Sequence, residues 1–228
     1  QDGTKAGAVN WFRLLERTEK EKFSEEEKRW IHVYRVMGEA MERPAGELLE
    51  KEEAKGKTKE EAIMLLNHKE ALDFILDNPD YLQYLSIRKI EDIHSILIKE
   101  LGVERHIRSR RVGITGTNYR PLDNEYQIRE AMEDTCQLIN NKQSIFDKAF
   151  LALVLLSYIQ PFADGNKRTA RITSNAILIA NGYCPLSFRS VDSIDYKKAM
   201  LVFYEQNNIY PFKKIFIEQF EFAVNTYF

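Results

Sequence analysis

The chain has 228 residues, of which 44% are hydrophobic and 30% are charged, a mixture typical of a folded protein rather than a disordered one. A chain of this length buries roughly 70–75% of its unfolded surface, so its fold needs no disulfide or metal.

The formal net charge is −2, whereas nucleic-acid-binding proteins are typically basic, so we expect no nucleic-acid partner. The longest apolar run, 149–156, is too short to cross a bilayer, so we expect no transmembrane helix and no membrane partner. Cys136 and Cys184 lack metal-ligand spacing and are expected to be reduced core thiols of a cytoplasmic protein.

Apolar residues recur at helical spacing along most of the chain, which predicts a succession of helices. The expected helices span 11–17, 24–41, 58–76, 86–101, 124–139, 144–159, 165–181, 192–207 and 211–226. A charged stretch with glycines at 46 and 56 separates the first two from the rest. We therefore divide the chain into a helical extension, 1–57, and a main domain, 58–228. The helix at 144–159 is apolar nearly all round and should be the central buried one.

One segment departs from the helical pattern. The segment 112–120 is short and contains both turn-forming and β-branched residues, as in Val-Gly-Ile-Thr-Gly-Thr. This composition predicts a β-hairpin or flap, which would be the only β-structure in an all-α domain.

The segment that follows the apolar helix carries the chemistry. Pro161 cannot continue that helix, and Asp164 can cap a new helix that Gly165 and Asn166 begin. A helix N-terminus presents free N–H groups to anions such as phosphates. Basic residues add to this site, and a carboxylate beside phosphates is a typical Mg²⁺ ligand. The basic residues are Lys167, Arg168 and Arg171, and the carboxylate is that of Asp164. The spacing alone also fits an ordinary helix start followed by a solvated basic turn.

These residues resemble a known motif, His-x-Phe-x-Asp/Glu-Gly-Asn-Gly/Lys-Arg-x-x-Arg, which belongs to the Fic/Doc (Fido-fold) proteins. The match comprises Phe162, Asp164, Gly165, Asn166, Lys167, Arg168 and Arg171. It fails at the first position, where Gln160 replaces the histidine. The segment 112–121 resembles the flap of this family, and 66–72 resembles a helix found in its longer members. The resemblance covers about 58–226 and implies a helical Fic fold.

The resemblance implies a protein adenylyltransferase, which transfers AMP from ATP to a hydroxyl of a target protein. Asp164 would hold Mg²⁺, Asn166 would belong to the catalytic motif, and Arg168 would grip the phosphates. The nucleotide would be bound by Gly165, Asn166, Lys167, Arg168 and Arg171, with the adenine near Tyr183, Pro185 and Phe188. The target would dock along the flap at Ile114, Thr115, Gly116 and Thr117. Arg171 is typical of the AMP-transferring members, whereas Lys167 is shared with the phosphotransferring Doc branch.

Gln160 stands where the family has its general base, and a glutamine amide cannot act as a base near neutral pH. The resemblance therefore implies weak or absent transfer together with retained nucleotide binding. Three explanations remain open: a natural pseudoenzyme, an introduced inactivating substitution, or slow transfer oriented by the amide. The functional alternatives are a catalytically inactive nucleotide-binding module and a Doc-like phosphotransferase.

Two further features are weaker. Glu42, in Gly-Glu-Ala-Met-Glu-Arg at 38–43, is the best match to the inhibitory glutamate that many family members carry, although Gly38 and Arg43 break the pattern. The aromatic residues near the C-terminus are expected in the core, with a self-association face as an alternative that would make a homodimer.

Overall fold

The computed structural model describes residues 59–188 and 190–227. The expected extension 1–57, including the inhibitory candidate Glu42, lies outside the described residues. The helices, in chain order, are α3 (Lys59–Asp77), the short 3-10 helix η1 (Pro79–Leu82), α4 (Ile87–Leu97), α5 (Glu125–Asn141), α6 (Ile145–Ile159), α7 (Asn166–Ala180), α8 (Ser193–Gln206) and α9 (Tyr210–Tyr227). Every element of the described residues is helical, which confirms the all-α prediction.

Short polar residues set where four of the helices begin. Ser86, Asn124, Ser144 and Asp192 immediately precede α4, α5, α6 and α8. Each of these side chains accepts a hydrogen bond from a backbone N–H two or three residues further on, which satisfies a donor that the helix leaves unpaired. The helix starts are therefore encoded locally in the sequence.

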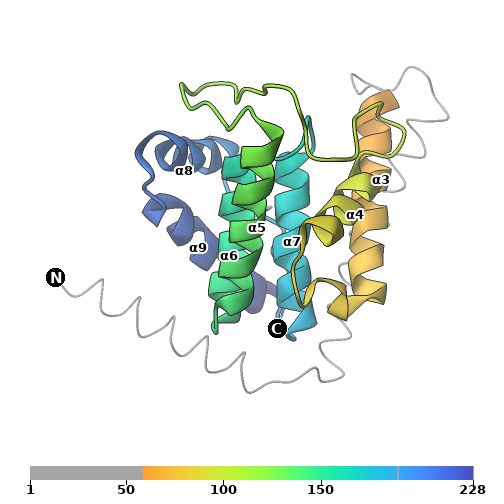
Figure 1. The fold of residues 1–228 in the computed structure, drawn as a ribbon. Coiled ribbons are helices and arrows are strands. Elements are labelled where there is room, and N and C mark those ends of the chain that lie inside the picture. The colour runs from red at the N-terminus through yellow and green to blue at the C-terminus, as the bar shows by residue number, and fades with distance from the viewer. Residues whose placement is uncertain (1–58, 189, 228) are drawn as a thin grey trace.

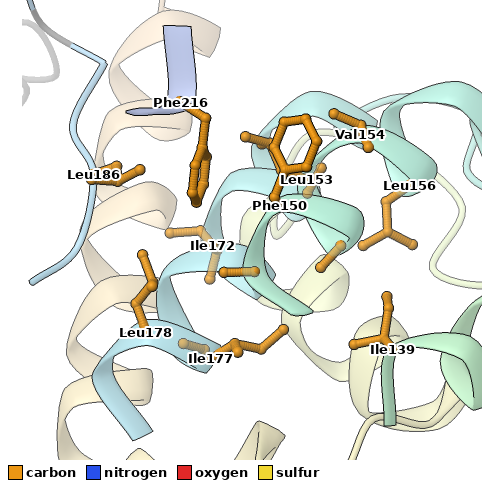
Figure 2. Close-up of a cluster of buried hydrophobic side chains, with 14 of the residues drawn as sticks. Ile139, Phe150, Leu153, Val154, Leu156, Ile172, Ile177, Leu178, Leu186 and Phe216 are labelled. Carbon is orange, nitrogen blue, oxygen red and sulfur yellow. The ribbon is translucent and has the colours of Figure 1, made fainter. Parts of the chain in front are cut away.

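Helices α6 and α7 form the centre of the molecule and pack along each other. The pair α3 and α4 lies on one side of this centre and the pair α8 and α9 on the other (Figure 1). Figure 2 shows how Leu153 of α6, Ile172 and Leu178 of α7 and Phe216 of α9 meet in one cluster. The prediction that 144–159 is the buried central helix agrees with this packing. The α6–α7 turn, which carries the motif, is thus anchored at both ends by the core.

The hairpin expected at 112–120 does not form: this segment has no strand and is a loop with a turn at 115–116. Its polar groups bond elsewhere, because Thr117 Oγ1 and Asn118 N donate to a Glu205 carboxylate oxygen of α8 at 2.8 and 3.2 Å. Tyr119 N donates to Thr117 Oγ1 at 3.0 Å. Pro121 lacks the backbone N–H that would bond to a neighbouring strand. We call residues 112–120 the flap.

The C-terminal aromatic residues belong mainly to the core. Phe212, Phe216 and Phe220 of α9 are buried, whereas Tyr210 at its start is exposed. Both cysteines are buried and free, as expected. None of the helices in the described part of the chain has the length and apolar character needed to cross a membrane.

Candidate functional site

The turn between α6 and α7 begins with a strained residue. Gln160 ends α6 in the left-handed conformation, with φ 52° and ψ 59°. A non-glycine residue there costs energy, and the following Pro161 further restricts it. Three contacts hold this backbone: Gln160 N donates to Leu156 O at 3.2 Å, the side-chain Nε2 donates to Ser157 O at 2.6 Å, and Gln160 O accepts from Arg108 Nε at 2.7 Å. Gln160 is therefore held in place through both its backbone and its side chain.

A reciprocal pair closes the turn. Asn166 Oδ1 accepts from Phe162 N, and Asn166 Nδ2 donates to Phe162 O, both at 2.8 Å. The Phe162 ring is fully buried and stacks on the His94 ring of α4 with 3.7 Å between centroids. The Asn166 side chain thus holds the turn itself.

His94 supports the same turn from α4. Its Nε2 lies 2.9 Å from Asp164 O and its Nδ1 lies 3.2 Å from Arg105 O. Both partners only accept, whereas a neutral imidazole donates through one nitrogen. Burial lowers the pKa of His94, although the two carbonyls oppose this by favouring the protonated ring. The shorter contact favours the neutral tautomer whose Nε2–H donates to Asp164 O.

Gly165 is the residue at which α7 begins, close to the end of α4. It has φ 78°, in the region that favours glycine, and a Cβ atom there would lie 3.3 Å from Ile98 Cγ2 and 3.5 Å from the His94 ring. A side chain at this position would therefore be both strained in its backbone and crowded by Ile98 and His94. Because an α-helix leaves its first N–H groups without intrahelical partners, the start of α7 offers N–H groups to an anion.

These groups open into a cleft of about 620 Å³. One wall comes from the turn and the start of α7, a second from the flap, and a third from α8. The lining residues are Val112 to Gly116, Gln160, Ala163 to Arg168, Tyr196, Lys197, Met200, Leu201 and Tyr204. Of the predicted site, the cleft brings together Gln160, Asp164, Gly165, Asn166, Lys167, Arg168 and the flap residues Ile114, Thr115 and Gly116.

Thr117 and Arg171 were predicted at the site but are not among the lining residues. Thr117 is bonded to Glu205. The Arg171 guanidinium lies over the rings of Tyr196 and Phe188, at 4.8 and 5.4 Å from their centroids. Its charge therefore lies next to Tyr196, which does line the cleft.

The cleft residues carry more positive than negative charge. Arg168, with a side chain 22% exposed, donates to Leu97 O at 3.2 Å and lies 3.5 Å from a carboxylate oxygen of Asp164, which is 66% exposed. Burial and then the charges of Arg171 and Lys197 lower the pKa of Lys167. An anion in the cleft would relieve this repulsion.

No group of three or more metal-binding side chains occurs in residues 59–188 and 190–227. Asp164 alone would therefore need further oxygens from a bound phosphate to complete a Mg²⁺ site. One carboxylate with phosphate oxygens is a common arrangement for this ion, so the donor set fits it.

Sequence reasoning missed the contribution of α8. The sequence predicted only a helix at 192–207. In the structure, α8 contributes to the cleft lining Tyr196, Lys197, Met200, Leu201 and Tyr204. Tyr183, expected near the adenine, instead packs on Phe146 and Phe220 in the core. Neither Pro185 nor Phe188 lines the cleft.

Arg108 was also missed. In the sequence it belongs to a run of basic residues typical of a solvated loop, yet it is only 1% exposed.

Comparisons with known proteins relate this chain to one family. The model of the Fic/DOC family matches residues 84–178, from the end of η1 to near the end of α7. A curated relative, protein adenylyltransferase fic-1 of Caenorhabditis elegans, is 24% identical over 145 residues, which cover 60% of this chain and 28% of that protein. Residues 84–178, which include the motif, are therefore similar to the Fic/DOC family.

Solved structures share the fold. Fic-1 from C. elegans superposes with a TM-score of 0.71 at 21% identity, over 98% of this chain and 71% of that one. IbpAFic2, solved covalently tethered to Cdc42, has a TM-score of 0.60 at 16% identity, over 94% of this chain and 69% of that one. The matched regions span at most 31% of the first curated relatives.

Substitution of three glycines can distinguish the energetic cost of backbone strain from the cost of crowding at this site. Gly165 has a positive φ and a close neighbour, Gly116 has φ 89° and open space, and Gly113 has neither restriction. We expect Gly165→Ala to lower the free energy of unfolding by about 2 kcal/mol or more, Gly116→Ala by about 1 kcal/mol, and Gly113→Ala to leave it within about 0.5 kcal/mol. Urea unfolding of the three variants measures these changes in the free energy of unfolding and so gives their order. Equal effects of Gly165→Ala and Gly113→Ala would contradict the geometry of the turn.

Proposed function

We propose that this chain is a Fic-type protein adenylyltransferase domain whose nucleotide site is intact and whose general base is missing. The observation that carries the proposal is the cleft itself. In one space it combines the α7 N-terminus, an exposed carboxylate, several cations and, at the family's base position, Gln160. The curated relatives named as adenylyltransferases support AMP transfer as the reaction class.

ATP fits the cleft by its chemistry. The N–H groups at the start of α7 would bind phosphate oxygens, with Lys167 and Arg168 adding charge-assisted contacts. The adenine would lie against the apolar and aromatic side chains of α8, namely Tyr196, Met200 and Leu201, opposite Ile114 of the flap. Asp164 would hold Mg²⁺ together with the phosphates, and the ion would neutralise charge on the phosphate oxygens.

The target is proposed to be a protein side-chain hydroxyl presented along the flap. In AMP transfer the hydroxyl oxygen bonds to the α-phosphorus, pyrophosphate leaves, and the hydroxyl proton must pass to a base. The flap has no internal strand pairing, so its backbone groups could pair with an extended segment of a target. The structural neighbour tethered to Cdc42 is an example in which a Fic protein engages a protein partner.

Gln160 limits the reaction at the proton step. Its amide donates to Ser157 O and carries no basic nitrogen. Charge stabilisation and positioning by the other groups do not depend on this side chain. Since general-base catalysis contributes typically about 10²–10⁴-fold, we propose weak or absent transfer with nucleotide binding retained.

The Gln160 Nε2 bond to Ser157 also favours a second candidate, an inactive nucleotide-binding module, because it assigns the side chain a structural role. Clear AMP transfer by the unaltered chain would eliminate that candidate. Lys167 favours a third, Doc-like phosphotransfer, which the mass added to a modified protein distinguishes from AMP transfer.

Restoring the base is the direct test of the proposed reaction. We expect Gln160→His to increase AMP incorporation about 10²–10⁴-fold over the unaltered chain when ATP, Mg²⁺ and lysate proteins are supplied. Gln160→Asn is the matched control, because it changes the same buried position, tolerates the left-handed backbone and supplies no base. Mass spectrometry of the modified proteins is the measurement. A well-folded histidine variant that labels neither itself nor any lysate protein would contradict the adenylyltransferase proposal.

Two adjacent lysines test the anion site. Lys197 lines the cleft and interacts electrostatically with Lys167, whereas Lys198 is directed at Asp195, 4.0 Å away, and does not line the cleft. We expect Lys197→Ala to weaken ATP binding about three- to tenfold, and Lys198→Ala by less than about twofold. Calorimetric titration at low ionic strength measures both. Equal affinities of the two variants would exclude Lys197 from the phosphate site.

A further inference from the structure

The two ends of the flap are held by a single buried arginine. Arg108 Nη1 donates to Arg110 O at 2.8 Å, just before the flap, and Nη2 donates to Leu122 O at 2.6 Å, just after it. The third donor of the same guanidinium, Nε, donates to Gln160 O at 2.7 Å. The Arg108 backbone N–H also donates to Pro161 O at 3.0 Å.

This arrangement is unusual for a buried charge. Among the described residues, no carboxylate is bonded to the Arg108 guanidinium, although its side chain is almost wholly buried. Burial lowers the pKa of Arg108, and the charge of Asp123 opposes this only in part. A buried charge is costly unless hydrogen-bonded, and here three backbone carbonyls provide those bonds.

We propose that Arg108 is a positioning residue that fixes the flap relative to residue 160, and thereby places a docked target over the nucleotide site. The flap lacks a β-ladder, so its loop is closed by the Arg108 guanidinium in place of strand pairing. The same group restrains the strained carbonyl of Gln160. One side chain therefore sets the distance between the surface that would hold the target and the position at which its hydroxyl would lose a proton.

Lysine cannot replace Arg108 in this role. An ammonium group is a compact donor on a flexible stem, whereas the three carbonyls are arranged around a planar fork. Arg108→Lys keeps the positive charge and is expected to lose at least one of the three contacts. Arg111 provides a matched control within the same loop, because its side chain is 85% exposed and pairs with Asp123 at 2.7 Å.

The first experiment does not depend on activity. We expect hydrogen–deuterium exchange of residues 111–121 to be about tenfold faster in Arg108→Lys than in the unaltered protein or Arg111→Lys, with exchange in α6 and α9 changed by less than about twofold. Unchanged exchange in 111–121, or a uniform increase throughout the chain, would overturn the proposal. If Arg108→Lys does not fold, the Nε–H proton of Arg108 in the unaltered protein decides instead. Protection of that proton relative to Arg111 supports the proposal, and equally fast exchange of the two overturns it.

The second experiment rests on the proposed function and uses the Gln160→His background. There, Arg108→Lys is expected to raise the KM for the protein target about tenfold while the KM for ATP changes by less than about twofold. A merely destabilising substitution would reduce the amount of active enzyme and leave both KM values unchanged, which would overturn the positioning role. If Gln160→His shows no transfer, the proposed function fails, and the exchange experiment still decides the role of Arg108.

Discussion

The site depends on how the chain reverses between two buried helices. Helices α6 and α7 are fixed by the core, and the residues between them must turn without losing a hydrogen bond in a buried place. Gln160 takes the left-handed conformation, Asn166 bonds both backbone groups of Phe162, and Gly165 lets α7 start against α4. Because Phe162 of this turn belongs to the core and Asn166 bonds to its backbone, the turn fixes where the first N–H groups of α7 lie.

The same constraint explains how the side chain at position 160 can vary while the rest of the cleft keeps its shape. The contacts that hold residue 160 mainly involve its backbone, through Leu156 O and Arg108, and the glutamine amide adds a bond to Ser157. The cations and Asp164 lie on α7 and its approach, and Lys197 lies on α8. Exchanging the side chain at 160 therefore removes a proton acceptor without removing the groups that would bind phosphate.

Much of the fold and part of the site could be predicted from the sequence, because both are encoded in local patterns. The apolar run at 144–159 predicted the buried helix α6. The motif predicted the turn into α7, although Gly165 and not Asp164 is the N-cap of that helix. The hairpin prediction failed because Glu205, distant in sequence, takes the polar groups of 117 and 118. The burial of Arg108 and the contribution of α8 could not be predicted for the same reason, since both arise only from tertiary packing.

The central claim is that the nucleotide site is preformed and independent of the base. Calorimetric titration of the unaltered chain and of Gln160→His with ATP and Mg²⁺ tests it most directly. The account predicts that both proteins bind, with Kd values within about threefold of each other, because the binding groups are the same in both. ATP binding by the histidine variant alone, or by neither folded protein, would contradict it.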